Sequence, residues 1–234
     1  MDFSVITDNL SYLLLGPYPQ GPLGGAALTL ILSVLSALLS SALGLVLGVA
    51  LAISRGAVHR ALLWGLGFFR AIPVIMLIFW TYFLLPIVLH IDAPALGTVV
   101  CALSLIGGAY LAHSVRAGID SLPAGQWQAA RALGMRPWQV LRWIILPQAL
   151  PAMAPSFINQ WISLVKDTSL AYVIGVGELS FVAAQVSNRV MVHPTEIFLF
   201  VGALYYVLCA ALAFGAHRLA NRFQVPGRLA DAVT

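Results

Sequence analysis

Charged residues are confined to short segments that separate long apolar runs. Asp, Glu, Lys and Arg are absent from five stretches, each of at least 21 residues, namely 9–54, 71–91, 93–115, 143–165 and 197–217. About 20 residues of α-helix cross the hydrocarbon core of a bilayer. The pattern therefore predicts five transmembrane helices, at about residues 26–53, 63–89, 96–116, 149–174 and 197–219.

Continuous apolar runs favour helices over a membrane β-barrel, whose strands alternate polar and apolar residues with a period of two. The composition argues against five core helices in a soluble protein. Charged residues make up 9% of the chain and hydrophobic residues 61%, whereas soluble domains carry about a quarter charged residues. We predict an all-α integral membrane protein in which residues 1–234 form a single transmembrane domain.

The basic residues indicate how the chain is oriented. If the loops between the five helices alternate sides, one side receives Arg189 as its only arginine, together with most of the acidic residues. The other side receives Arg55, Arg60, Arg116, Arg131, Arg136, Arg142, Arg218, Arg222 and Arg228. Because cytoplasmic loops are enriched in Lys and Arg, we expect the N-terminus outside and the C-terminus in the cytoplasm. This topology accounts for the pI near 9.4, and we expect no nucleic-acid partner.

The predicted cytoplasmic loop, residues 120–147, holds a group of arginines in an otherwise apolar chain. A short helix at residues 124–133 fits the sequence, and Gly134 fits the left-handed position that ends such a helix. A second helix would begin at Pro137 and continue toward the membrane until Pro147.

Trp127, Ala130 and Leu133 fall near one face of the first helix, which we expect to be exposed, with the small Ala129 beside them. Such a face suits insertion into the groove of a partner protein. An amphipathic helix that lies on the lipid surface would suit the arginines equally well. The physical pattern leaves both interpretations open.

The loop resembles the signature of importer-type ABC permeases, which reads Glu-Ala-Ala, three residues, Gly, nine residues, Ile-x-Leu-Pro. Here Gln128-Ala129-Ala130, Gly134 and the residues at 144–147 keep that spacing. Gln128 replaces the usual Glu, so it loses the charge but keeps an amide for hydrogen bonding. The resemblance implies a type I ABC importer permease that docks on an ATPase through Trp127, Gln128, Ala129, Ala130, Leu133, Gly134, Ile144, Leu146 and Pro147.

Four further blocks, at residues 68–73, 108–110, 115–119 and 166–170, resemble the polar amino-acid branch of that family. The resemblance implies a bacterial cytoplasmic (inner) membrane location and a second permease subunit, identical or homologous. It also implies two cytoplasmic ATPase subunits and a periplasmic or lipid-anchored amino-acid-binding protein. ATP and Mg would be held by the ATPase, with no cofactor, metal or catalytic residue in this subunit.

Ionisable groups inside a membrane segment are costly and mark candidate functional sites. The candidates for a substrate pathway are Arg70, His113, Lys166, Asp167, Thr168 and Ser169. Asp, Thr and Ser are good N-cap residues, so we expect the helix to break there and a new helix to begin at Leu170, offering free backbone amides to a substrate carboxylate. The alternatives are an interfacial Arg70, a structural His113, and an ion-pair network at Lys166 and Asp167.

The substrate class is suggested by His113, which stands where the branch resembled commonly has Glu. Together with Arg70 and Lys166, the loss of an acid favours acidic or neutral polar amino acids, and residues 70–80 resemble permeases of the glutamate/aspartate subgroup. Glu178, Glu196, Arg189 and His193 are expected in an outward loop, either solvated or in contact with the binding protein.

Two other functions are less consistent with the sequence. An intramembrane enzyme would need a metal or nucleophile motif, but the five histidines show no metal-like spacing. A channel or stand-alone carrier would leave the arginine-rich loop at residues 120–147 unexplained.

Overall fold

The computed structural model describes residues 4–191 and 194–223, with no side-chain description at 217 and 219–223, and every regular element in this part is a helix. The all-α prediction is therefore confirmed. The elements are α1 (Ser4–Leu15), α2 (Gly25–Ile53), α3 (Gly56–Ala71), α4 (Val74–Phe79), the π-helix η1 (Trp80–Leu84), α5 (Leu85–Leu89), α6 (Ala95–Asp120), α7 (Ala124–Ala132), α8 (Pro137–Val140), the π-helix η2 (Leu141–Ile145), α9 (Leu146–Asp167), the 3₁₀-helix η3 (Thr168–Ile174), α10 (Leu179–Val190) and α11 (Pro194–Phe223).

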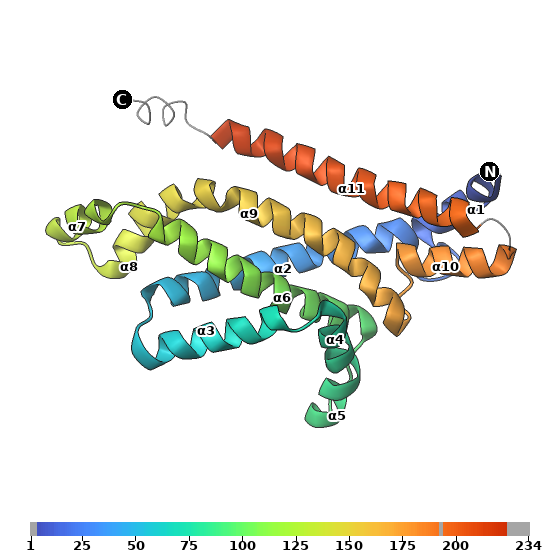
Figure 1. Ribbon diagram of the computed structural model, residues 1–234, viewed down its shortest axis with the longest axis horizontal. Coiled ribbons are helices and arrows are strands. Elements are labelled where there is room, and N and C mark those ends of the chain that lie inside the picture. The colour runs from blue at the N-terminus through green and yellow to red at the C-terminus, as the bar shows by residue number, and fades with distance from the viewer. Residues whose placement is uncertain (1–3, 192–193, 224–234) are drawn as a thin grey trace.

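The helices form an elongated bundle, with α7 and α8 at one end and α1 and α10 at the other (Figure 1). Within the described residues, α2, α6 and α11 are long and apolar enough to cross a membrane, and the bent pair of α3 with α4–α5 makes a fourth candidate. The predicted fourth span, now α9, does not meet this criterion, because it carries Gln148, Asn159, Gln160, Lys166 and Asp167. A helix with this composition is suited to the protein interior rather than to lipid on all sides.

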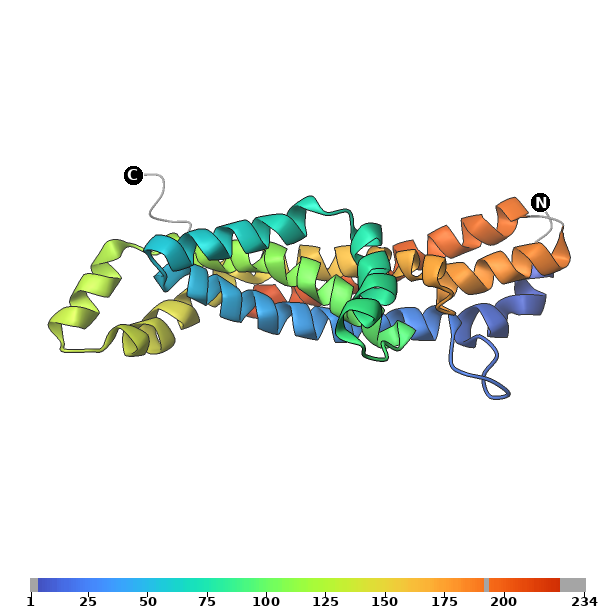
Figure 2. The same ribbon diagram turned by 90° about the horizontal axis from the view of Figure 1, so that it is seen from below.

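The predicted second span, residues 63–89, is not one straight helix. It comprises α3 and the segment α4–η1–α5, which are bent by 100° relative to each other. Pro73 has no backbone N–H and disfavours helical geometry at the residue before it, and Ile72 accordingly adopts an extended ψ of 133°. The short segment α4–η1–α5 therefore leaves the bundle almost at a right angle to α3 (Figures 1 and 2).

The predicted helix break near Leu170 is wrong. Helix α9 continues without interruption into the 3₁₀-helix η3, which ends at Gly175. The hydroxyl of Thr168 donates to the Val165 carbonyl and that of Ser169 to the Lys166 carbonyl, both at 2.7 Å. These hydroxyls bond backward along the helix and do not cap a new one.

The segment before the last helix was expected to be a loop, and it instead contains helix α10. The side chain of Glu178 accepts a hydrogen bond from the Phe181 N–H and so provides its N-cap. One apolar cluster joins α10 to the outer parts of α1, α2 and α11 through Leu13, Ala26, Leu179, Val182, Ala183, Val186, Ile197 and Val201. Burial against the other helices thus stabilises α10, although the charged residues in and around this segment had suggested a loop.

Helices α2 and α6 are the most intimately packed pair, and they lie side by side in both views (Figures 1 and 2). Glycines of α2 allow this approach. A Cβ atom at Gly48 would lie 2.5 Å from the Cβ of Val115 and 2.6 Å from the carbonyl oxygen of Ala112. Small residues at a helix contact let two backbones come close, which is a common device in membrane bundles.

Replacing Gly48 with alanine is expected to destabilise the bundle, because the new methyl group would overlap both Val115 and a backbone carbonyl that cannot rotate away. Overpacking of this kind costs about 1–3 kcal/mol. The thermal unfolding midpoint in detergent should fall accordingly. The matched control is Gly202→Ala in α11, where nothing lies within 4 Å of an added Cβ; equal midpoints for the two variants would contradict the packing argument.

Candidate functional site

Helix α7 is the part of the chain that projects furthest from one end of the bundle (Figures 1 and 2). It covers Ala124–Ala132, and Gly134 follows with a φ of +78°. The predicted helix and the left-handed glycine that ends it are both confirmed.

The expected orientation of α7 is wrong for two of its residues. Ala130 is buried and Trp127 is half-buried. Both face the protein, where they pack on a cluster formed by Val115, Ile119, Val140, Leu141, Ile145, Ala149 and Met153. A large apolar ring gains more free energy by being buried in its own subunit than by remaining in water until a partner arrives.

The exposed residues of α7 include Gln128, Ala129 and Arg131, and Leu133 directly after the helix is 82% exposed. A side chain this apolar and this exposed, beside a small alanine, is available for contact with another molecule. The exposed and buried faces together make α7 a rigid projection, attached to the bundle on one side and free on the other.

The segment after α7 stays helical from Pro137 to Ile174, through a wide π-helical turn at η2. Pro147 therefore lies in the first turn of α9 and does not end a helix, contrary to the prediction. Within this segment Leu141, Ile145, Ala149 and Met153 recur every four residues and are buried. Of the other docking candidates, Ile144 and Leu146 are half-buried and Pro147 is exposed.

A cavity of about 460 Å³ lies between α6 and α9, lined by His113, Ser114, Ala117, Gly118, Ser121, Ala152, Met153 and Ser156. The Nε2 atom of His113 is buried and has no hydrogen-bond partner among the described residues. Arg70 and Arg116 lie within electrostatic range of the same imidazole. A buried polar atom that lacks a partner is one that a ligand can satisfy, and the nearby positive charge favours an anionic group.

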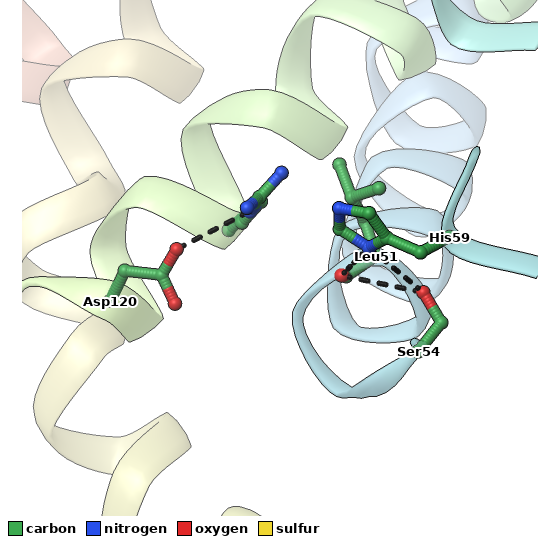
Figure 3. A network of polar contacts seen from close by, with 5 residues as sticks. Leu51, Ser54, His59 and Asp120 are labelled. Atoms are coloured by element: carbon green, nitrogen blue, oxygen red, sulfur yellow. Dashed lines mark hydrogen bonds and ion pairs between the residues drawn. The ribbon is translucent and has the colours of Figure 1, made fainter. Parts of the chain in front are cut away.

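The two arginines near the cavity are held by different contacts. The guanidinium carbon of Arg70 lies 5.1 Å from the ring centroid of Tyr110, a cation–π geometry. The Nε of Arg116 forms an ion pair with Asp120 at 3.3 Å, seen beside the His59 network at the end of α2 (Figure 3). In that network Nδ1 of His59 contacts the Leu51 carbonyl oxygen at 3.1 Å, which makes His59 a structural residue of the α2–α3 turn.

The six predicted pathway residues fall into two groups. Arg70 and His113 lie near the cavity, whereas Lys166, Asp167, Thr168 and Ser169 lie ten or more residues beyond the cavity residue Ser156, about 15 Å along the helix. Lys166 is exposed and Asp167 half-buried, and neither forms an ion pair with a described residue. Leu170, which follows Ser169, packs against the same apolar cluster as Phe69 and Ile72 beside Arg70, and a shared role of the two groups stays a prediction.

A buried polar cluster around Glu178 was not expected from the sequence, which placed this acid in an outward loop, either solvated or in contact with the binding protein. Its side chain is 0% exposed. Its Oε1 accepts from the Phe181 N–H at 2.9 Å, and its Oε2 accepts from the Tyr205 hydroxyl at 2.8 Å. Beside it, the Leu179 N–H donates to Thr29 Oγ1 at 3.1 Å. The cluster ties α2, α10 and α11 together. The sequence feature that could have indicated α10 and its N-cap is the position of Glu178, an acid directly before an apolar segment.

The charge state of Glu178 is expected to make stability depend on pH. Burial raises the pKa of its carboxyl from the ordinary 4.5, although hydrogen bonds oppose the rise. The folded state then holds the proton more tightly than the unfolded state. The stabilisation is complete below pH 4.5 and is lost as the pH rises through the raised pKa. The thermal unfolding midpoint in detergent should therefore fall as the pH rises from 4.5 through the raised pKa. Glu178→Gln should remove this dependence of the midpoint on pH.

Asp8→Asn provides the matched control, since Asp8 is an exposed acid on α1 at the same end of the bundle. It should leave the slope unchanged. A Glu178→Gln variant that keeps the wild-type pH dependence would show that another group titrates.

Comparisons with known proteins agree with this architecture. A family model described as "Binding-protein-dependent transport system inner membrane component" matches residues 44–224. Over 148 residues the chain is 38% identical to the glutamate/aspartate import permease protein GltK of Escherichia coli O157:H7, covering 60% of this chain and 65% of that protein. Over 204 residues it is 33% identical to the glutamine transport system permease protein GlnP of Escherichia coli K12, covering 86% and 92%. Over 202 residues it is 34% identical to the arginine transport system permease protein ArtQ of Bacillus subtilis, covering 84% and 90%.

Solved structures show the same fold. A chain of an amino acid ABC transporter crystallised with histidines superposes with a TM-score of 0.81 at 24% identity, covering 95% of this chain and 99% of that one. A chain of the inward-facing MetNI methionine ABC transporter gives a TM-score of 0.74 at 23% identity, covering 85% and 94%. The helical arrangement is therefore shared with these chains.

Proposed function

The chain belongs to the family of binding-protein-dependent transport system inner membrane components, and on that premise we propose that it is the permease subunit of an ATP-driven ABC importer for polar amino acids. The observation that carries this proposal is helix α7. It is exposed on one face, ends at the left-handed Gly134, and is fixed to the bundle on its other face.

The packing of α7 explains how a partner's motion would reach the substrate. Trp127 and Ala130 contact a cluster contributed by α6, α8, η2 and α9. The cavity with His113 lies between α6 and α9. When nucleotide binding closes a pair of ATPase subunits, a displacement of α7 would be transmitted through this close-packed cluster to both walls of the cavity. That is the rigid-body motion that alternating access requires.

The cavity supports an acidic or neutral polar amino acid as the substrate. Arg70 and the unpaired Nε2 of His113 would attract a carboxylate, whereas Arg116 is already paired with Asp120. The serines of the lining offer hydroxyls to a polar side chain. Relatives named for glutamate/aspartate and for glutamine are consistent with this class, while the one named for arginine shows that substrates differ among proteins of similar identity.

The partners would be those that the family name implies. A cytoplasmic ATPase pair would hold ATP and Mg, a second permease subunit would complete the pathway, and an external binding protein would deliver the amino acid. In this arrangement α7 faces the cytoplasm and α1 and α10 face outward, in the bacterial inner membrane, as the distribution of arginines indicates.

The proposal is tested by uptake in proteoliposomes that contain this permease, its ATPase and its binding protein. ATP is enclosed inside the vesicles. The binding protein is added outside, together with labelled glutamate, glutamine or arginine, one at a time. Accumulation that needs both ATP and the binding protein is the expected result. Uptake that proceeds without the ATPase would identify a stand-alone carrier instead.

A further inference from the structure

Two exposed tryptophans and an arginine form a compact group where the chain passes from α8 into η2. The guanidinium carbon of Arg142 lies 6.0 Å from the ring centroid of Trp138 and 5.2 Å from that of Trp143. The two tryptophans are 58% and 64% exposed. A soluble surface seldom exposes two indoles together, so this group has the character of a contact surface.

The group offers hydrogen-bond donors and lacks acceptors. Neither the guanidinium of Arg142 nor the indole N–H of Trp138 or Trp143 forms a hydrogen bond or an ion pair with a described residue. The sequence contains no Asp or Glu between Asp120 and Asp167. The complementary ligand is therefore an anion with several acceptor oxygens.

The position of the group on its helix narrows the choice of ligand. The buried positions of this helix face the bundle, at Leu141, Ile145 and their four-residue repeats. Away from those buried positions, exposed Trp143 is followed by exposed Pro147 and Leu150 on α9, and exposed Trp138 lies one turn before Arg142. The exposed strip is thus cationic and aromatic at its outer end and apolar further along the helix.

We propose that Arg142, Trp138 and Trp143 bind the phosphate of an anionic phospholipid, whose acyl chains lie along the exposed strip of α9. The inference rests on the orientation given under the proposed function, which places α8 at the cytoplasmic leaflet. Anionic lipids are attracted to basic groups at that surface, and indoles prefer the level of the headgroups. A soluble partner docked on α7 would supply carboxylates but would not cover the apolar end of the strip.

The bound lipid would have a mechanical consequence. Helix α8 and η2 connect the docking helix α7 to α9, which forms one wall of the cavity. A headgroup held at Arg142 would fix this connection to the membrane surface, so that a displacement of α7 is passed to α9 instead of tilting the loop.

The test compares binding of two lipids with identical acyl chains, dioleoyl phosphatidylglycerol and dioleoyl phosphatidylcholine. The purified permease–ATPase complex is titrated with each, and bound lipid is counted by native mass spectrometry. Wild-type protein should prefer phosphatidylglycerol, and Arg142→Gln should lower that preference about fivefold. Paired Trp138→Phe and Trp143→Phe changes, which keep an aromatic ring at each position but remove both N–H donors, should lower this preference less.

Arg60→Gln is the matched control, because Arg60 is an exposed arginine of α3 on the same proposed side. It should keep the preference. An Arg142→Gln complex that retains the full preference would overturn the proposal. Loss of ATPase co-purification with unchanged lipid binding would instead assign Arg142 to the protein interface. Because lipid binding is counted without transport, its outcome is separate from that of the uptake assay.

Discussion

Replacing Gly134 with valine is expected to reduce ATP-driven uptake by about tenfold or more while the permease still inserts and folds. The φ of +78° at this position is one that a β-branched residue adopts only with strain. Nothing lies within 4 Å of an added Cβ, so the substitution acts through backbone conformation and not through crowding. The end of α7 must then change its geometry, which displaces the exposed Leu133. Uptake in proteoliposomes measures the effect, with membrane yield and unfolding midpoint as folding controls.

Gly65→Val provides the matched control for that experiment. Gly65 lies in α3, its φ is ordinary, and an added Cβ would likewise meet nothing within 4 Å. This variant should transport nearly as well as wild type. Normal uptake by Gly134→Val, at wild-type protein levels, would remove α7 from the coupling mechanism.

Replacing His113 with glutamate is expected to shift the selectivity of the transporter away from acidic and toward cationic amino acids. The side chain lines the cavity and its Nε2 has no partner among the described residues, so a carboxylate placed there would face the substrate directly. Two carboxylates held close together repel each other. Uptake of labelled glutamate should fall about tenfold or more relative to that of arginine. Competition assays in the same proteoliposomes give the ratio.

His113→Gln separates the charge effect from the change of shape. A neutral amide keeps hydrogen-bonding capacity, so the glutamate-to-arginine ratio should stay near the wild-type value. A ratio that shifts equally in both variants would mean that the cavity geometry, and not the charge at this residue, determines selectivity. An unchanged ratio in both would place the substrate elsewhere.

The parts of the fold that follow from local physics were predictable. The absence of charge over long stretches indicated helices, and α2 begins at Gly25, one residue from the expected start of the first span. The short helix and left-handed Gly134 were predictable for the same reason, since both depend on neighbouring residues.

Features that depend on distant contacts were not predictable. Trp127 is half-buried because it packs on a cluster that contains Val140 and Ile145, later in the chain. Glu178 is buried because Tyr205 of α11 and Thr29 of α2 surround it. In both cases the partners are set by tertiary packing, and a single sequence does not state which residues become neighbours.

The role of the predicted pathway residues in transport stays a prediction, whereas the helix break expected among them is absent. His113 lies at a cavity and Arg70 is within electrostatic range of it. The polar string beginning at Lys166 was interpreted as a broken helix because Thr and Ser favour N-caps, but their hydroxyls found acceptors in the preceding turn. Whether these residues contact substrate remains a prediction for the uptake assays.

If this subunit transmits ATPase motion to an amino-acid pathway, ATP hydrolysis in liposomes must respond to the loaded binding protein. The permease–ATPase complex is reconstituted, and hydrolysis is measured before and after adding binding protein loaded with its amino acid. We expect a several-fold rise in hydrolysis that is absent from the Gly134→Val complex. Hydrolysis that is measurable at the basal level and does not change on adding the loaded binding protein would contradict it.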